Sequence, residues 1–300
     1  MPEPQAVTKD EVLNRLSSLR QHRRKGQRSP HKPLLLLFAI GRLSTTGTSA
    51  IEWSAAESQL AELIQDYGPP ATSSRIQRAA YPFTHLRTDK VWTLDHDVPM
   101  DDVRPLAEHH VVGRLEPWLE DALRDPEIAT AAARRLVETE FPPTVAPDVL
   151  AAVGLDPDVI LGRGAATTVR ARRSEWPREI INAWDRQCAF CGFDGQLGDA
   201  VVGVEAAHVR WFNFGGPDEA DNGMALCSLH HKLFDRGALG LDASMRINVS
   251  GHFYGRTDPG KAVYDLHRRA LRPRPGTALP ATEHVEWHWE EVFKSPALVA

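Results

Sequence analysis

The chain has 300 residues, 42% of them hydrophobic and 25% charged, which is the composition of an ordinary globular protein long enough for two domains. Its longest apolar run, Pro33 to Ile40, is far shorter than the about 20 residues of a membrane-spanning helix, and the N-terminus lacks the layout of a secretory signal; we therefore expect a cytoplasmic protein without membrane contact. The net charge of -5 argues against a protein that coats nucleic acid indiscriminately, but not against a local basic surface.

Basic residues dominate the first part of the chain. No acidic residue lies between Glu11 and Glu52, and this stretch contains eight basic residues: Arg15, Arg20, Arg23, Arg24, Lys25, Arg28, Lys32 and Arg42. Such a pattern is typical of a phosphate-binding surface. From Asp95 to Glu127 the balance reverses, with ten acidic residues against three arginines, which indicates a solvated face.

The N-terminal half is predicted to be mainly helical. Thr8-x-x-Glu11 and Ser54-x-x-Glu57 are capping boxes, and each precedes apolar residues at helical spacing. Pro33 fits the first turn of the most apolar helix, which we expect at the centre of this domain's core.

Further elements and a linker follow. We expect a short hairpin over residues 83–94, because apolar residues follow a Thr88-Asp89-Lys90 turn. A helix is predicted from Pro126 to about Glu140, where Phe141-Pro142-Pro143 ends it. From Asp156 to Arg173 neither helical nor strand periodicity is visible, so we predict a linker at 163–173 between domains at 1–162 and 174–300.

Four residues of the C-terminal half have the spacing of a zinc site. Cys188-x-x-Cys191 is followed, after thirty-five residues, by Cys227-x-x-His230. Three thiolates and one imidazole can complete a tetrahedron, and because this leaves no position for a substrate, the site is predicted to be structural. Three cysteines cannot form a closed disulfide framework, so metal binding is favoured over oxidation.

A second set of residues is interleaved with these ligands: Glu205-Ala-Ala-His208, Asp221-Asn222-Gly223 and His231-Lys-Leu-Phe-Asp235. With this set, residues from about 176 to 240 resemble the HNH endonucleases of the McrA-like branch. The resemblance implies a ββα-metal fold, in which two short strands and a helix surround one divalent ion and a zinc knuckle supports them. The expected fold class is therefore α+β, with this domain after a mainly helical DNA-binding domain.

The resemblance also implies a role for each member of the trio. His208 is expected to be the general base, Asn222 to hold the loop and orient His208 or support the metal shell, and His231 to bind the catalytic ion. Many HNH enzymes carry a metal ligand directly before the base, where this chain has Ala207. Strand alternation places Glu205 on the same side, so Glu205 is either a ligand of the ion or a structural residue.

Metal chemistry of this kind cuts one strand. A double-strand break therefore needs two such domains, and we expect a homodimer. Mg²⁺ and Mn²⁺ both suit the expected ligands, and the sequence does not choose between them.

The basic stretch carries a second resemblance. Arg23-Arg24-Lys-Gly-Gln-Arg28-Ser-Pro-His31-Lys32-Pro33 and the leucines after it, with Tyr81-Pro82-Phe83 and Phe141-Pro142-Pro143-Thr144, resemble the sulfur-binding domains fused to HNH nucleases in phosphorothioate-dependent restriction enzymes. This implies that an apolar cup made by Tyr81, Pro82 and the stem of His85 holds the sulfur, and that the other phosphate oxygens are bonded by Arg24, Arg28, His31 and Lys32. The family often has a small residue where this chain has His85.

The sequence thus predicts a modification-dependent restriction endonuclease that recognises phosphorothioated double-stranded DNA and cuts nearby with Mg²⁺ or Mn²⁺, beside a structural Zn²⁺. One alternative is an HNH endonuclease directed to another DNA modification, such as a methylated base. Another is a non-cutting DNA-binding protein that contains zinc, which would leave His208, Asn222 and His231 without a role.

Overall fold

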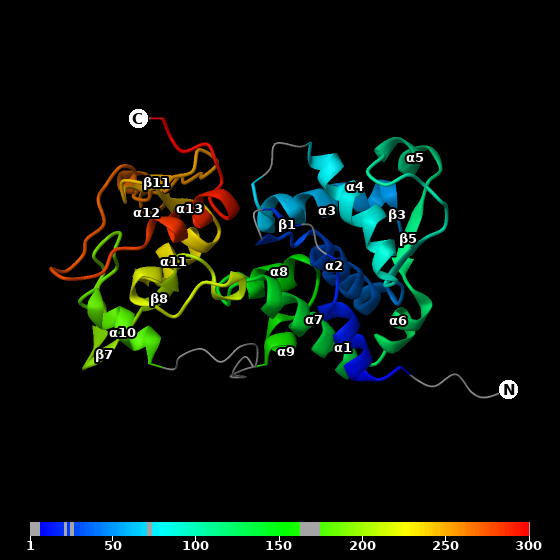
Figure 1. The fold of residues 1–300 in the computed structure, drawn as a ribbon, viewed down its shortest axis with the longest axis horizontal. Coiled ribbons are helices and arrows are strands. Elements are labelled where there is room, and N and C mark those ends of the chain that lie inside the picture. The colour runs from blue at the N-terminus through cyan, green and yellow to red at the C-terminus, as the bar shows by residue number, and fades with distance from the viewer. Residues whose placement is uncertain (1–6, 21–22, 25–26, 71–73, 163–174, 300) are drawn as a thin grey trace. The chain divides into compact units, whose positions relative to one another are not determined.

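The computed structural model describes residues 7–20, 23–24, 27–70, 74–162 and 175–299; for residues 23–24 and 27–28 it describes only the backbone. Two compact units lie on either side of residues 163–174, which include the predicted linker and fall outside the described residues. Helices and small sheets give the expected α+β class (Figure 1). No helix in the described part of the chain combines the length and apolarity needed to cross a bilayer.

The N-terminal unit consists of helices with short strands between them. Its helices are α1 (Lys9–Ser17), α2 (His31–Thr46), α3 (Trp53–Tyr67), α4 (Arg75–His85), η1 (Leu86–Asp89), α5 (Val103–Glu108), α6 (Pro117–Ala122), α7 (Pro126–Glu140), α8 (Ala146–Ala152) and α9 (Pro157–Leu161). Its strands are β1 (Arg23–Arg24), β2 (Gln27–Arg28), β3 (Ile51–Glu52), β4 (Trp92–Leu94) and β5 (Val112–Leu115). The strands β3, β5 and β4 form one antiparallel sheet in that order, and β1 pairs with β2.

Helix α2 forms the centre of the N-terminal core. The leucines at 34–37 are fully buried, and α2 packs against α3, α4 and α7 (Figure 1). Pro33 lies in the first turn, as predicted, where its missing N–H costs no helical hydrogen bond. Gly47 follows the helix with a φ of 78°, a left-handed conformation that glycine adopts without strain.

The two predicted capping boxes have different outcomes. The Thr8 hydroxyl accepts a hydrogen bond from the Glu11 amide, and the Glu11 carboxylate accepts one from the Thr8 amide, which confirms the first box. The second is wrong, because α3 begins at the buried Trp53 and Ser54 donates its hydroxyl hydrogen to Glu52. The predicted helix from Pro126 to Glu140 is confirmed as α7.

The hairpin predicted over residues 83–94 is not formed. Phe83 belongs to α4, and the strand β4 pairs with β5 instead of with the segment before it. The reason is packing, because the Phe83 ring lies edge-to-face on Trp53 and Trp92, with ring centroids 5.1 and 5.5 Å apart. Gly113 of β5 makes room for this cluster, since a Cβ there would lie 2.3 Å from the Trp92 ring.

Lys32 takes part in a buried ion pair. Its ammonium group donates to Asp89 at 2.6 Å and to the Arg20 carbonyl oxygen at 2.7 Å, and both charged side chains are only 4% exposed. The other Asp89 oxygen accepts from the Arg20 amide at 2.8 Å. The pair therefore fixes the chain before β1 to the start of α2 and the end of η1.

Replacing Lys32 with alanine should lower the free energy of unfolding of the N-terminal unit by about 3–5 kcal/mol, because Asp89 would be left buried without its counter-charge. Urea unfolding followed by circular dichroism measures this. Lys9→Ala is the matched control: it breaks the exposed pair with Glu127 and should cost less than about 1 kcal/mol. If the two variants lose the same free energy of unfolding, the buried pair stabilises the unit no more than the exposed pair does.

The C-terminal unit contains the two strands and the helix expected of a ββα-metal domain. Its helices are α10 (Trp176–Ala183), η2 (Phe212–Phe214), η3 (Ala220–Asn222), α11 (Ser228–Asp235), α12 (Asp258–Lys261), η4 (Tyr264–Leu266) and α13 (Thr282–Glu291). Its strands are β6 (Gln196–Leu197), β7 (Ala200–Val201), β8 (Val204–His208), β9 (Gly223–Cys227), β10 (Leu239–Leu241) and β11 (Ile247–Val249).

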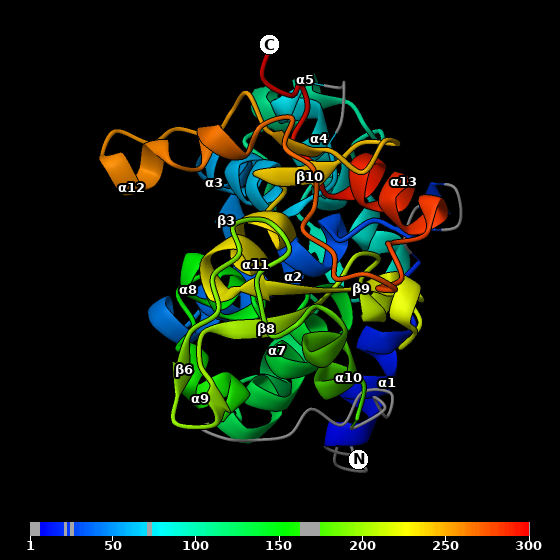
Figure 2. The ribbon, with the colours of Figure 1, turned by 90° about the vertical axis from the view of Figure 1, so that its left-hand side faces the viewer.

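Strands β8 and β9 form an antiparallel ladder in which Val204 faces Cys227 and His208 faces Gly223. Helix α11 follows β9 directly and packs on both strands, as does α10 (Figure 2). This topology places His208 at one end of the ladder and the residues of the β9–α11 junction at the other.

Candidate active site and nucleic-acid interface

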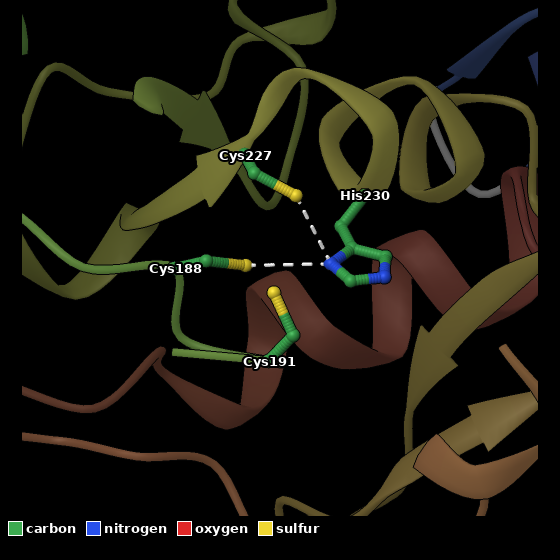
Figure 3. A group of neighbouring side chains, drawn as sticks. All are labelled: Cys188, Cys191, Cys227 and His230. Carbon is green, nitrogen blue, oxygen red and sulfur yellow. Dashed lines mark hydrogen bonds between the residues drawn. The ribbon is translucent and has the colours of Figure 1, made fainter. Parts of the chain in front are cut away.

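Cys188, Cys191, Cys227 and His230 form one cluster, as their spacing predicts. Their ligand atoms all lie within 4.8 Å of one another. The sulfur atoms of Cys188 and Cys227 lie 3.4 and 3.2 Å from Nδ1 of His230 (Figure 3). Since sulfur and nitrogen ligands of a tetrahedral zinc ion are about 3.6 Å apart, the four residues fit Zn²⁺ with little adjustment.

The protonation of the three thiols is uneven. Hydrogen bonds from Cys227 and His230 lower the pKa of Cys188 to about 3, so this residue is a thiolate at neutral pH. The hydrogen bond to Cys188 raises the pKa of Cys227, and burial raises the pKa of Cys191. A zinc ion bound by these residues would supply the positive charge that stabilises all three as thiolates, which is the ordinary state of cysteine ligands.

His208 is the last residue of β8 and is largely buried. Trp176 of α10 stacks on its ring with a centroid distance of 3.8 Å and an interplanar angle of 14°. Nε2 of His208 lies 2.8 Å from a carboxylate oxygen of Asp218, whose side chain is also mostly buried. The stacked indole and the carboxylate therefore hold the imidazole in one orientation.

Asn222 holds the loop between β8 and β9. Its side-chain oxygen accepts from the Arg210 amide at 2.8 Å, and its side-chain nitrogen donates to the carbonyl oxygens of Arg210 and Pro217, both at 3.0 Å. The side chain is fully buried. These contacts are those of a residue that fixes the loop carrying Asp218 beside His208.

The structure brings His231 and Glu205 together. Nδ1 of His231 lies 2.8 Å from one Glu205 oxygen, and Ser228 donates its hydroxyl hydrogen to the other at 2.6 Å. These hydrogen bonds, that of His231 foremost, lower the pKa of Glu205, which is consequently ionised. On the other edge of the ring, Nε2 of His231 lies 3.3 Å from Asp235, one helical turn further along α11.

Asp235 is itself held in place. Its side chain is only 2% exposed, and its second oxygen accepts a hydrogen bond from Nε1 of Trp211 at 3.0 Å. A carboxylate on one ring nitrogen is the usual way to orient a metal-binding imidazole, whose other nitrogen then faces the ion. In this chain the other nitrogen is Nδ1, which faces Glu205.

One imidazole nitrogen and one carboxylate oxygen suit Mg²⁺ or Mn²⁺, which in phosphoryl chemistry complete their shells with water and substrate oxygens. Within the described residues, the cysteine–histidine cluster alone collects three or more ligand atoms within 4.8 Å. Glu205 and His231 therefore fit a site in which water and substrate oxygens complete the ligand shell of the ion. They fit less well a site in which protein ligands alone surround it.

Asp218, Asp235, Trp176 and Trp211 have no role in the sequence-based prediction. The i,i+4 spacing of His231 and Asp235 on a helix is a signal that identifies Asp235. No periodic signal identifies Asp218, because its loop follows no regular structure.

In the N-terminal unit, three of the predicted DNA-binding residues come together. The rings of Tyr81 and His85 stack with centroids 4.4 Å apart, and the His31 ring lies against Tyr81 at 6.2 Å in an edge-on arrangement. Nε2 of His85 lies 2.9 Å from Asp101, which fixes the ring. Burial and the nearby charges of Asp101 and Asp89 raise the pKa of Tyr81, so its hydroxyl stays protonated.

The other four predicted residues lie differently. Pro82 is buried within α4. Arg24 and Arg28 belong to the paired strands β1 and β2, for which only the backbone is described. Lys32 points inward to Asp89, which differs from the exposed position assumed for a phosphate contact; the short distance to a buried carboxylate explains its orientation.

Family models match both units. A model described as ScoMcrA-like, DNA sulfur-binding domain matches residues 9–158, and a model described as HNH endonuclease matches residues 188–242. No protein with a curated description matches the chain.

Three solved structures are similar to parts of the chain. The sulfur-binding domain of ScoMcrA complexed with phosphorothioated DNA is 23% identical, with 47% of this chain and 97% of that chain covered and a TM-score of 0.40. The sulfur-binding domain of SprMcrA complexed with phosphorothioated DNA is 23% identical, with 52% and 92% covered and a TM-score of 0.35. The type IV phosphorothioation-dependent restriction endonuclease ScoMcrA is 20% identical, with 65% and 41% covered and a TM-score of 0.40.

Because the first family model covers residues 9–158, which is half of the 300 residues, the chain belongs to the ScoMcrA-like DNA sulfur-binding domain family, and its C-terminal unit carries an HNH endonuclease domain.

Proposed function

We propose that this protein is a restriction endonuclease that binds phosphorothioated double-stranded DNA through its N-terminal unit and hydrolyses a nearby phosphodiester bond with its HNH domain and a divalent ion. The observation that carries the proposal is the joint presence of two sites: the stacked Tyr81 and His85 in the sulfur-binding unit, and, in the nuclease unit, the Glu205–His231 pair together with the buried His208.

The aromatic cluster suits sulfur because of hydration. Sulfur in place of a non-bridging phosphate oxygen keeps the negative charge but is larger, softer and less strongly hydrated. An aromatic wall made by Tyr81 and His85 accommodates it, whereas oxygen in the same place loses water without compensation, at a cost of about 1–3 kcal/mol. Pro82 lies on the same helix, and we assign the third wall of the cup to the His85 ring, which stacks on Tyr81.

Phosphate contacts come from the neighbouring basic segment. Arg28 on β2 precedes His31 by three residues, so the strands β1 and β2 lead directly into the aromatic cluster. We assign Arg24, Arg28 and His31 to the remaining phosphate oxygens. Lys32 holds this segment in place through Asp89, and its contact with a phosphate requires that the buried pair opens.

In the nuclease unit, His208 takes the proton from the attacking water. The Asp218 carboxylate, 2.8 Å from its Nε2, stabilises the imidazolium that forms, and Trp176 keeps the ring from turning. Asn222 keeps the Asp218 loop in place. Glu205 and His231 would hold a divalent ion, which when bound would supply charge neutralisation on the scissile phosphate and the leaving oxygen.

The test of this proposal compares two duplexes of identical sequence, one of which carries a single phosphorothioate. The intact chain should bind the modified duplex about 5- to 150-fold more tightly, the factor that corresponds to 1–3 kcal/mol, and should cut only that duplex when Mn²⁺ or Mg²⁺ is added. Equal affinity for the two duplexes would eliminate sulfur recognition and favour another modification, such as a methylated base, as the target.

Tyr81→Ala should bring the affinity ratio of modified to plain duplex close to one, because the wall against the sulfur is removed while the basic segment remains. Fluorescence anisotropy with both duplexes measures the ratio. Tyr254→Ala, which removes an exposed tyrosine from the other unit, is the control and should keep the wild-type ratio. A Tyr81→Ala protein with undiminished preference for sulfur would place the cup elsewhere.

Asp235→Asn should weaken the binding of the catalytic ion about 10- to 100-fold, because the neutral amide no longer orients His231 as a carboxylate does. The measurement is the Mn²⁺ concentration that gives half-maximal cleavage, with the rate at saturating Mn²⁺ largely restored. Asp265→Asn, a change at an exposed aspartate, should leave the Mn²⁺ requirement unchanged. Loss of rate without a shift in the Mn²⁺ requirement would contradict the role given to Asp235.

We also propose that two chains act together as a homodimer, since one HNH domain cuts one strand, and that the protein acts in the cytoplasm, where DNA is accessible to it.

A further inference from the structure

The segment after the HNH core is strongly basic, in contrast to the chain as a whole. Residues 246–274 contain seven arginines and lysines against two aspartates, whereas the full chain has a net charge of -5. The seven basic residues are all exposed: Arg246, Arg256, Lys261, Arg268, Arg269, Arg272 and Arg274. This segment lies beyond residues 188–242, which match the HNH endonuclease model.

Three of these arginines meet at the edge of the β10–β11 sheet. The Arg268 amide donates to the Ile247 carbonyl oxygen, the Ile247 amide donates to the Arg269 carbonyl oxygen, and Arg246 forms an isolated bridge with Ala270. The Arg246 guanidinium lies 3.4 Å from the Arg268 carbonyl oxygen. The backbone thus brings three arginine residues together at this edge.

The chain then continues to the zinc cluster. The Arg272 amide donates to the carbonyl oxygen of Ala189, between the first two cysteine ligands, and a Cβ at Gly192 would lie 3.0 Å from the Arg272 guanidinium. Pro273 and Pro275 fix φ on either side of Arg274, which stiffens this part of the segment. Seven residues, 268–274, reach about 20 Å when extended, which is about six base-pair steps at 3.4 Å each.

Few carboxylates neutralise this surface. Among the ion pairs of the described residues, none involves Arg246, Arg268, Arg269 or Arg272; we call these four residues the basic edge. A hydrogen bond from the Arg246 amide, foremost, and the charge of Arg268 help to lower the pKa of Asp242, and Asp185 pairs with the neighbouring Arg274 at 3.3 Å. Arg268 also has a φ of 65°, in the left-handed region that residues with a side chain rarely adopt.

We infer that the basic edge is a second DNA-binding surface, which contacts the phosphate backbone of duplex DNA regardless of base sequence or sulfur. Clustered, exposed guanidinium groups repel one another unless an anion lies between them, and a regular row of phosphates is the anion that matches a stiff row of arginines. The inference rests on the proposed nuclease function. The basic edge would let the nuclease unit bind the DNA substrate by contacts of its own, in addition to those of the sulfur-binding unit.

The experiment uses the full chain and the plain and phosphorothioated duplexes of one sequence. The variant carries Arg268→Gln and Arg269→Gln, and its control carries Arg104→Gln and Arg135→Gln, which remove the same charge from exposed positions of the N-terminal unit. Binding is measured between 50 and 200 mM salt. For the first variant the affinity for both duplexes should fall by the same factor, at least about fivefold, and the slope of log affinity against log salt should shrink by about 2, whereas the control should match the wild type.

The inference is overturned if the Arg268/Arg269 variant binds plain duplex with wild-type affinity and slope, or if the control loses as much. Zinc content and melting temperature show that the variant is folded; Arg272→Gln gives a second test, since its fixed hydrogen bond involves only the backbone. If the protein does not recognise sulfur, the wild type binds the two duplexes with an affinity ratio of one. The comparison of wild type and variant on plain duplex then still tests the basic edge.

Discussion

Replacing Cys188 with serine is expected to unfold the C-terminal unit and to release its zinc, not merely to slow cleavage. The cysteine is fully buried and its sulfur lies 3.4 Å from His230, so serine would remove a ligand from the middle of the unit's core. Structural zinc contributes about 10–16 kcal/mol in small zinc domains, which exceeds the total stability of a typical domain. Zinc content and the unfolding transition of the purified protein measure the effect.

The adjacent histidines provide the control. His230 belongs to the zinc cluster, whereas His231, the next residue, faces Glu205. His231→Ala should therefore keep its zinc and its melting temperature while losing cleavage, and His230→Ala should behave like Cys188→Ser. A Cys188→Ser protein that retains stoichiometric zinc and melts like the wild type would show that the cluster does not support the fold.

The zinc cluster could be predicted because its geometry is local. Two ligands separated by two residues at a turn or a helix start point to the same side, so two such pairs identify a tetrahedral site without knowledge of the rest of the fold. The same holds for α7, where aspartate, proline and a double proline mark both ends.

Lys32 shows where local reasoning ends. A lysine beside arginines and a histidine is ordinarily exposed, since lysine is almost never buried unless it is paired. Its partner Asp89 lies 57 residues away in sequence, and no pattern around either residue indicates that they meet. The hairpin expected over residues 83–94 fails for the same reason, because the partner of β4 is a later strand.

The active site likewise contains residues that the sequence identifies and residues that it does not. The order of His208, Asn222 and His231 identifies the nuclease, and the pairing of β8 with β9 explains why His208 ends a strand. Asp218, the acidic partner of His208, lies in a loop, and Asp235, the acidic partner of His231, lies one turn further along the same helix. Asp218 reaches His208 only because Asn222 holds the loop between the strands, an arrangement that depends on backbone contacts which no spacing encodes.

His208→Ala is expected to reduce the rate of cleavage about 10²- to 10⁴-fold, the usual contribution of a general base, and to leave binding of the phosphorothioated duplex unchanged. The side chain is buried between Trp176 and Asp218, and it is not one of the four residues of the cysteine–histidine cluster. Single-turnover cleavage at saturating enzyme measures the chemical step, and anisotropy with Mn²⁺ omitted measures binding.

Two further variants separate catalysis from packing. Asp218→Asn keeps a hydrogen bond to His208 but removes the charge that stabilises the imidazolium, so its rate should lie between those of His208→Ala and the wild type. His96→Ala, at an exposed position of the N-terminal unit, should cut at the wild-type rate. If His208→Ala cuts as fast as the wild type, the base is a different group; if Asp218→Asn cuts as fast as the wild type, the carboxylate only fixes the loop and the imidazolium needs no stabilisation from it.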